Sequence, residues 1–170
     1  MRRNTVVTTV LGLALTACVT QDVQLDRRHV QEPSARALVG NVSCRLPAFD
    51  LIDARSYRGL GWINGHELLY PELNSWIDKT LHGAATADAD AASLIVEINR
   101  AYIETHPSGH SFQLVLRVRT RDRADDHWRV YRGNESGVTW WGNSGEFGTY
   151  VEKAGQMAIG DLVKYEGRCK

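Results

Sequence analysis

The chain has 170 residues, of which 43% are hydrophobic and 24% charged. This composition is typical of a globular domain and excludes a disordered or collagen-like chain. The 20 basic and 20 acidic residues balance, and removing the two arginines that precede residue 18 leaves 18 basic against 20 acidic, a net charge of −2. Such a chain is a poor general nucleic-acid binder, because the phosphate backbone rewards clustered positive charge.

Residues 1–18 have the layout of an export signal. Two arginines precede a mostly apolar run of about ten residues, Val6 to Leu15, which is too short to span a membrane. The tetrapeptide Leu15-Thr16-Ala17-Cys18 resembles the lipobox of bacterial lipoproteins. The resemblance implies cleavage after residue 17 and attachment of a diacylglyceryl group to the Cys18 thiolate. The alternative is a plain secretory signal with an incidental cysteine.

A lipid at Cys18 predicts stable anchoring, since two or more acyl chains hold a protein firmly on a membrane. In Gram-negative lipoproteins an aspartate just after the lipidated cysteine favours the inner membrane. Val19 stands there in this chain, so the resemblance favours the outer membrane, facing the periplasm. Residues 18–36 are polar and predict a lipidated, flexible tether, followed by one α+β domain over residues 37–170.

The other two cysteines are Cys44 and Cys169. Paired cysteines of exported proteins usually form disulfides, so we predict a bridge that closes most of the domain. Neither residue has a Cys or His neighbour at metal-ligand spacing, which makes a metal site the weaker alternative, beside a reactive thiol. No cofactor or metal is predicted.

The first half of the domain predicts one strand and one helix. Residues 37–46 have strand character and end at Pro47, and residues 50–65 are predicted to be a long irregular connection. A helix is expected from about Tyr70 to Gly83. It carries an apolar stripe at spacings of three and four, made of Leu69, Leu73, Trp76, Ile77 and Leu81.

The second half predicts three strands and a final helix. Strands are expected over residues 93–105, 110–120 and 128–132, with 137–141 extending or following the third. The last helix is predicted over residues 149–164. Its expected buried side is formed by Tyr150, Val151, Ala154, Met157, Ala158, Leu162 and Val163. The order β-α-β-β-β-α predicts a two-layer α+β domain, with an antiparallel sheet of three to four strands and two amphipathic helices packed on one face.

Several features together resemble the YajG-type periplasmic lipoproteins. They are Asp53-Ala54-Arg55, Gly59, the helix with Leu73, Trp76 and Leu81, the paired strands, and a terminal helix with Ala158, Ile159, Asp161 and Leu162. The outline is also similar to that of the auxiliary lipoproteins of lipid-transport ABC systems. The resemblance implies an accessory or binding role.

A catalytic centre is not evident in the sequence, and we predict that the protein is not an enzyme. His106 and His110 flank a turn without a third metal ligand, and are predicted to be solvated. Ser108 lies beside them, but no Gly-x-Ser-x-Gly elbow is present. Glu97 and Glu104 are an odd number of residues apart, so they face opposite sides of a strand unless a bulge intervenes.

Two clusters are candidates for partner binding. Arg117 and Arg119 share the outward face of a strand with Arg121, and Arg129 lies on the next strand. They predict either a solvated basic face or a patch for anionic lipid head groups, lipopolysaccharide or an acidic partner. The adjacent Trp140 and Trp141 cannot both face the core of a strand, so one is expected either to cap the sheet edge or to anchor a protein or glycan.

The favoured hypothesis is a membrane-anchored, noncatalytic binding or assembly module of the cell envelope. It would bind the membrane through its N-terminal lipid and contact an envelope protein complex, an anionic lipid or a glycan, and no nucleic acid. The alternatives are an envelope hydrolase acting on the cell wall, and an inhibitor or host-facing factor.

Overall fold

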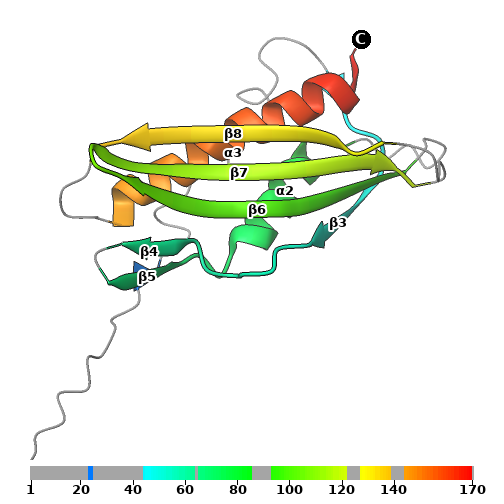
Figure 1. The fold of residues 1–170 in the computed structure, drawn as a ribbon. Coiled ribbons are helices and arrows are strands. Elements are labelled where there is room, and N and C mark those ends of the chain that lie inside the picture. Colours follow the sequence, from blue (N-terminus) through cyan, green and yellow to red (C-terminus); the bar gives the residue numbers. More distant parts are fainter. Residues whose placement is uncertain are drawn as a thin grey trace, which may run out of the picture.

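A four-stranded sheet forms the centre of the computed structural model (Figure 1). The structure describes residues 23–24, 44–63, 65–85, 93–121, 127–138 and 144–169. The strand order is β3-β6-β7-β8, with bounds β3 Phe49–Asp53, β6 Leu94–His106, β7 Gly109–Thr120 and β8 Arg129–Gly137. The β6–β7 and β7–β8 pairs are antiparallel, while β3 runs parallel to β6. The predicted α+β class is confirmed.

The first strand of this sheet differs from the predicted one. The sequence of β3, Phe-Asp-Leu-Ile-Asp, alternates between inward apolar and outward positions, so Phe49 and Leu51 pack against the core. The segment predicted as a strand, residues 37–46, contributes only β2, Cys44–Arg45, among the described residues. β2 pairs with β9, Arg168–Cys169, in a separate two-stranded sheet. The prediction that residues 50–53 begin an irregular connection is therefore wrong.

Two helices lie behind the sheet in the view of Figure 1. α2 spans Leu73–Gly83 and buries Leu73, Trp76, Ile77 and Leu81, as its stripe predicts. α3 spans Ser144–Glu166, starts five residues before the predicted boundary, and packs against β7 and β8. Met157, predicted to be buried, is 41% exposed, because the buried stripe of α3 passes through Ala154, Ala158 and Ile159 instead.

A small sheet, ordered β1-β5-β4, lies below one end of the main sheet (Figure 1). Its strands are β1 Val23–Gln24, β4 Gly61–Ile63 and β5 His66–Leu69. β4 and β5 form a hairpin within the predicted irregular connection, with Ile63 opposite His66 and a turn glycine, Gly65, at φ 82°. β1 runs parallel to β5, with Val23 opposite Leu68. The tether predicted as one flexible spacer is therefore joined to the domain at β1.

The core lies between the helices and the main sheet. Its largest fully buried side chains include Phe112, Phe147, Leu114 and Leu116. The small sheet is attached to this core through β6, because the Ile103 amide donates to the Leu60 carbonyl. None of the helices in the described part of the chain has the length and apolarity needed to cross a membrane.

Candidate functional site

One face of the four-stranded sheet carries neither of the two described helices (Figure 1). Side chains alternate along each strand, and the inward set of β6 and β7 is apolar and buried. The outward set is more polar and is called the open face below. It includes Asp50, Ile52, Ile95, Glu97, Arg100, Val115, Arg117, Arg119, Trp128, Val130 and Arg132, and continues toward the β6–β7 turn with Tyr102, Glu104, Gln113 and Asn134.

Three side chains of the open face form what we call the Arg-Trp cluster: Arg117, Arg119 and Trp128. The guanidinium carbons of Arg117 and Arg119 lie 4.9 and 4.8 Å from the ring centroid of Trp128. Both distances fall within the range of about 6 Å over which an aromatic face attracts a cation. The register causes this proximity: Val118 pairs with Arg129, so Trp128 comes opposite Arg119.

The positive charge of the Arg-Trp cluster is only partly balanced within the described part of the chain. The Arg117 Nη2 donates to the Glu97 Oε2 at 2.6 Å. No ion pair of Arg119 is formed with any described residue, and the Nε atoms of Arg117 and Arg119 are buried without an acceptor there. A buried donor left without a partner costs about 1–3 kcal/mol. The terminal Nη atoms of Arg119 are not among these buried atoms, and they are the ones that can donate to a carboxylate bound at this position.

Apolar side chains border the cluster. Val130, which pairs with Arg117 across β7 and β8, is 47% exposed, and Ile52 on the edge strand β3 is 46% exposed. Arg121 was predicted to share the outward face of the strand with Arg117 and Arg119. It forms an ion pair with Asp50. A surface with arginine and tryptophan at its centre and exposed aliphatic residues beside them has the composition of a protein-binding site.

Arg129 does not join the other arginines. It lies on the helix side of β8, where its Nη2 donates to the Glu166 Oε2 at 3.1 Å. The hydroxyl of the buried Tyr131 donates to the same carboxylate. Burial first, and then the contact with Glu166, raises the pKa of Tyr131 above its ordinary value of 10.0. The contacts of Arg129 and Tyr131 with Glu166 hold the C-terminal end of α3 against β8.

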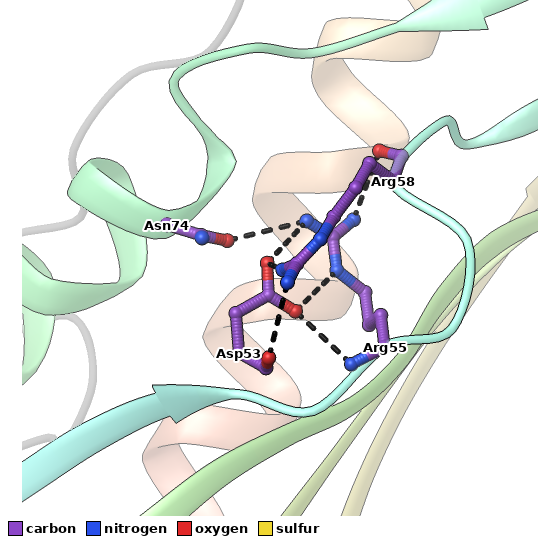
Figure 2. A network of polar contacts seen from close by, with 4 residues as sticks. All are labelled: Asp53, Arg55, Arg58 and Asn74. Atoms are coloured by element: carbon purple, nitrogen blue, oxygen red, sulfur yellow. Dashed lines mark hydrogen bonds and ion pairs between the residues drawn. The ribbon is translucent and has the colours of Figure 1, made fainter.

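A second polar group lies where β3 ends (Figure 2). The Asp53 carboxylate accepts from the Arg55 Nε at 3.0 Å and from the Arg55 Nη2 at 2.9 Å, a two-pronged contact. The exposed Arg58 guanidinium also pairs with Asp53, and Asn74 of α2 accepts from the Arg55 Nη2 at 3.2 Å. Burial lowers the pKa of the Arg55 guanidinium below its ordinary value.

This second group has a structural use. The Arg55 and Asp53 side chains are 5% and 9% exposed, and their contacts join the end of β3, the following loop and the start of α2. A buried pair of this kind is saturated by its own partners and leaves little capacity for a ligand. The Asp53-Ala54-Arg55 motif that enters the family resemblance therefore acts here as a fold-stabilising contact.

The histidines beside the β6–β7 turn do not form a catalytic triad. The His106 Nε2 lies 3.0 Å from the Ser111 Oγ and 4.0 Å from the Glu104 Oε2, so serine and carboxylate approach the same ring nitrogen. A triad needs the acid on the other nitrogen, to orient the ring. His110, predicted to be solvated, is buried beside Phe147, and its Nδ1 lies 3.1 Å from the Thr105 Oγ1.

Glu97 and Glu104 face the same side of the sheet, because a bulge between Ile98 and Arg100 shifts the register. Seven residues of strand separate them by roughly 23 Å. Glycosidase carboxylates lie about 5–9.5 Å apart, so these two cannot act as a pair. Among the described residues no group of three or more His, Cys, Asp or Glu side chains is arranged to hold a metal ion.

Three predicted site residues, Cys18, Trp140 and Trp141, lie outside the described residues. Cys44 and Cys169 are directly opposite each other in the β2–β9 pair, and the Cys44 sulfur is disulfide-bonded. The identity of Cys169 as the bonded partner stays a prediction. Sequence reasoning missed the role of Trp128, although its two-residue spacing from Val130 of β8 is the spacing of side chains that share a face.

No family model and no curated protein matches the chain. A solved structure titled "Crystal structure of uncharacterized protein" is similar over 85% of this chain and 99% of its own, with a TM-score of 0.48 and 9% sequence identity. Its title states no activity.

Proposed function

We propose that the mature protein is a lipid-anchored, noncatalytic binding module of the bacterial envelope, and that its open face binds an acidic region of a partner protein. The lipobox-like tetrapeptide ending at Cys18 supports the anchor. Val19 supports the outer membrane, facing the periplasm, as its location. The resemblance to YajG-type lipoproteins supports an accessory role.

The observation that carries the binding proposal is the Arg-Trp cluster. Arg119 has its charge held at the sheet surface by Trp128, with no carboxylate among the described residues to balance it. A rotamer-rich arginine that is already stacked loses less conformational freedom on binding than a free one. A carboxylate placed there would gain a charge-assisted hydrogen bond, which is stronger than a neutral one.

A protein is favoured over a sugar or nucleic acid as the partner because of the flanking residues. Exposed Val130 and Ile52 add aliphatic surface to the cluster. Such residues are of use against another protein surface, where arginine and tryptophan commonly carry most of the binding energy.

In-cell photocrosslinking tests the binding proposal. A photoreactive amino acid at position 130 should capture a partner in the native envelope. The same residue at position 157, on α3 and similarly exposed, is the matched control and should not capture it. Arg119→Glu should abolish the crosslink from position 130, because it replaces the unbalanced cation by an anion. Equal capture from both positions, or capture that survives Arg119→Glu, would refute the proposed site.

Metabolic labelling tests the anchor separately. Wild-type protein should incorporate radioactive palmitate and fractionate with membranes, whereas Cys18→Ser should incorporate none. Labelling of the Cys18→Ser protein would show that the lipobox interpretation is wrong.

A further inference from the structure

The small sheet lies closer along the chain to Cys18 than any other described element. β1 begins at Val23, five peptide steps after Cys18. Even a fully extended segment of that length reaches only about 17 Å. Because β1 is joined to β5 by strand pairing, this reach applies to the folded domain and not just to a loose end.

The outer face of the small sheet carries two exposed aromatic residues. Trp62 of β4 is 55% exposed, and Tyr57 in the loop before β4 is 46% exposed. Both lie beside Glu67: Trp62 is its register partner, and the Tyr57 hydroxyl donates to its carboxylate. The opposite face of the same hairpin is buried, through Ile63 and Leu68.

We propose that this outer face, with Trp62 and Tyr57, contacts the surface of the bilayer that holds the Cys18 lipid. The inference rests on the proposed anchor at Cys18 and adds a second contact that orients the domain. Tryptophan and tyrosine are the side chains that favour the headgroup region, because each has an apolar ring and a polar atom. The contact is aromatic and not electrostatic, since the charged group between the two rings is an acid.

The proposed bilayer contact determines how far the Arg-Trp cluster lies from the membrane. The small sheet is attached at Ile103 of β6, whereas Arg119 lies opposite Ile95 of the same strand. Eight residues of strand separate these positions by roughly 25 Å. The cluster is at the other end of the main sheet from the bilayer contact, where a partner protein has access to it.

Fluorescence quenching by brominated lipid tests the proposed contact of Trp62 with the bilayer. The full-length lipidated protein is reconstituted into phosphatidylcholine vesicles with or without bromine near the headgroup end of the acyl chains. Tryptophan emission of the wild type should be quenched in the brominated vesicles. Trp62→Phe should lose at least half of the quenched intensity, while Trp128→Phe, which removes a tryptophan at the far end of the sheet, should retain it.

Mass spectrometry of the same samples separates the two proposals. If Cys18 carries lipid but Trp62→Phe is quenched as much as the wild type, the proposed bilayer contact is wrong and the lipid anchor is confirmed. If Cys18 carries no lipid, the proposed anchor is wrong, and the bilayer contact that depends on it is refuted too. Trp62 is mostly exposed, so its replacement by phenylalanine leaves the fold intact.

Discussion

Gly133 of β8 lies directly against the backbone of Ala154 in α3, so closely that a Cβ atom at position 133 would be 1.7 Å from the Ala154 carbonyl oxygen. The helix can approach the sheet at this point only because residue 133 has no side chain. The same approach allows Tyr131 and Arg129, on the same face of β8, to reach Glu166 at the end of α3.

Gly133→Ala should therefore destabilise the domain by about 2 kcal/mol or more, since the helix must move away from the sheet. Gly83→Ala is the matched control, because a Cβ atom at this glycine in α2 meets nothing within 4 Å. It should be neutral or stabilise by up to about 1 kcal/mol through helix propensity. Urea unfolding measures both, and equal effects would contradict the close approach.

The buried pair at the end of β3 gives a second prediction. Asp53→Ala leaves the Arg55 guanidinium buried without its carboxylate, which should lower the free energy of unfolding by about 3–5 kcal/mol. Arg58→Ala removes an exposed cation from the same carboxylate and should cost about 0–1 kcal/mol. The free energies of unfolding of the two variants are measured by denaturation under identical conditions. Equal losses would contradict the structural role of the buried Asp53–Arg55 pair.

Tyr131 predicts a dependence of stability on alkaline pH. Its pKa is raised in the folded protein, so the folded state holds the phenol proton more tightly than the unfolded state does. The resulting stabilisation is fully present below about pH 10, the pKa of an unfolded tyrosine, and is lost as the pH rises further. Tyr131→Phe has no proton to lose and should show a shallower decline.

The measurement is the free energy of unfolding of wild type and Tyr131→Phe at about pH 9 and about pH 11. Parallel declines in the two proteins would show that Tyr131 does not contribute to the pH dependence.

The strand pair β2–β9 gives the fourth prediction. Non-reducing peptide mapping should recover Cys44 linked to Cys169, because the backbone register places them opposite each other. A bond that closes a loop of this length stabilises by roughly 4–5 kcal/mol in the chain-entropy model. The Cys44→Ala/Cys169→Ala double variant should lose stability of that order. Recovery of Cys169 as a free, alkylatable thiol would exclude the pairing.

Long, regular elements could be predicted from the sequence because their own residues specify them. β6 and β7 alternate buried and more exposed side chains over much of their length, and α2 repeats its apolar residues at helical spacing. These patterns record burial on one side, which is a local property of each segment. The α+β class follows from their order along the chain.

Short strands were missed because their pairing depends on distant partners. β1 has two residues and exists only because β5 offers it an edge. The β4–β5 hairpin did leave a signal, since Asn64-Gly65 is the dipeptide that favours a two-residue hairpin turn. It was obscured by the polar and glycine-rich residues around it.

The candidate site was predictable in part. Alternation along β7 correctly placed Arg117 and Arg119 on one outward face. The separation of Arg129 from them, and the meeting of both arginines with Trp128, depend on the β7–β8 register, which a single sequence does not reveal. The contacts of Asp53 and Arg55 could not be predicted for the same reason, because Arg55 meets Asn74 of α2, which is distant in sequence (Figure 2).

The parallel pairing of β3 with β6 has a consequence for the order in which the domain folds. Parallel neighbours need a crossover, and here the crossover contains the β4–β5 hairpin and α2. The antiparallel β6, β7 and β8 are linked in sequence and need no distant partner, so we expect them to form first, and pulse-labelling hydrogen exchange should protect β7 amides before those of β3. The β4–β5 hairpin lies within this crossover, so its exposed Trp62 would reach its final position relative to the main sheet only when β3 has paired with β6.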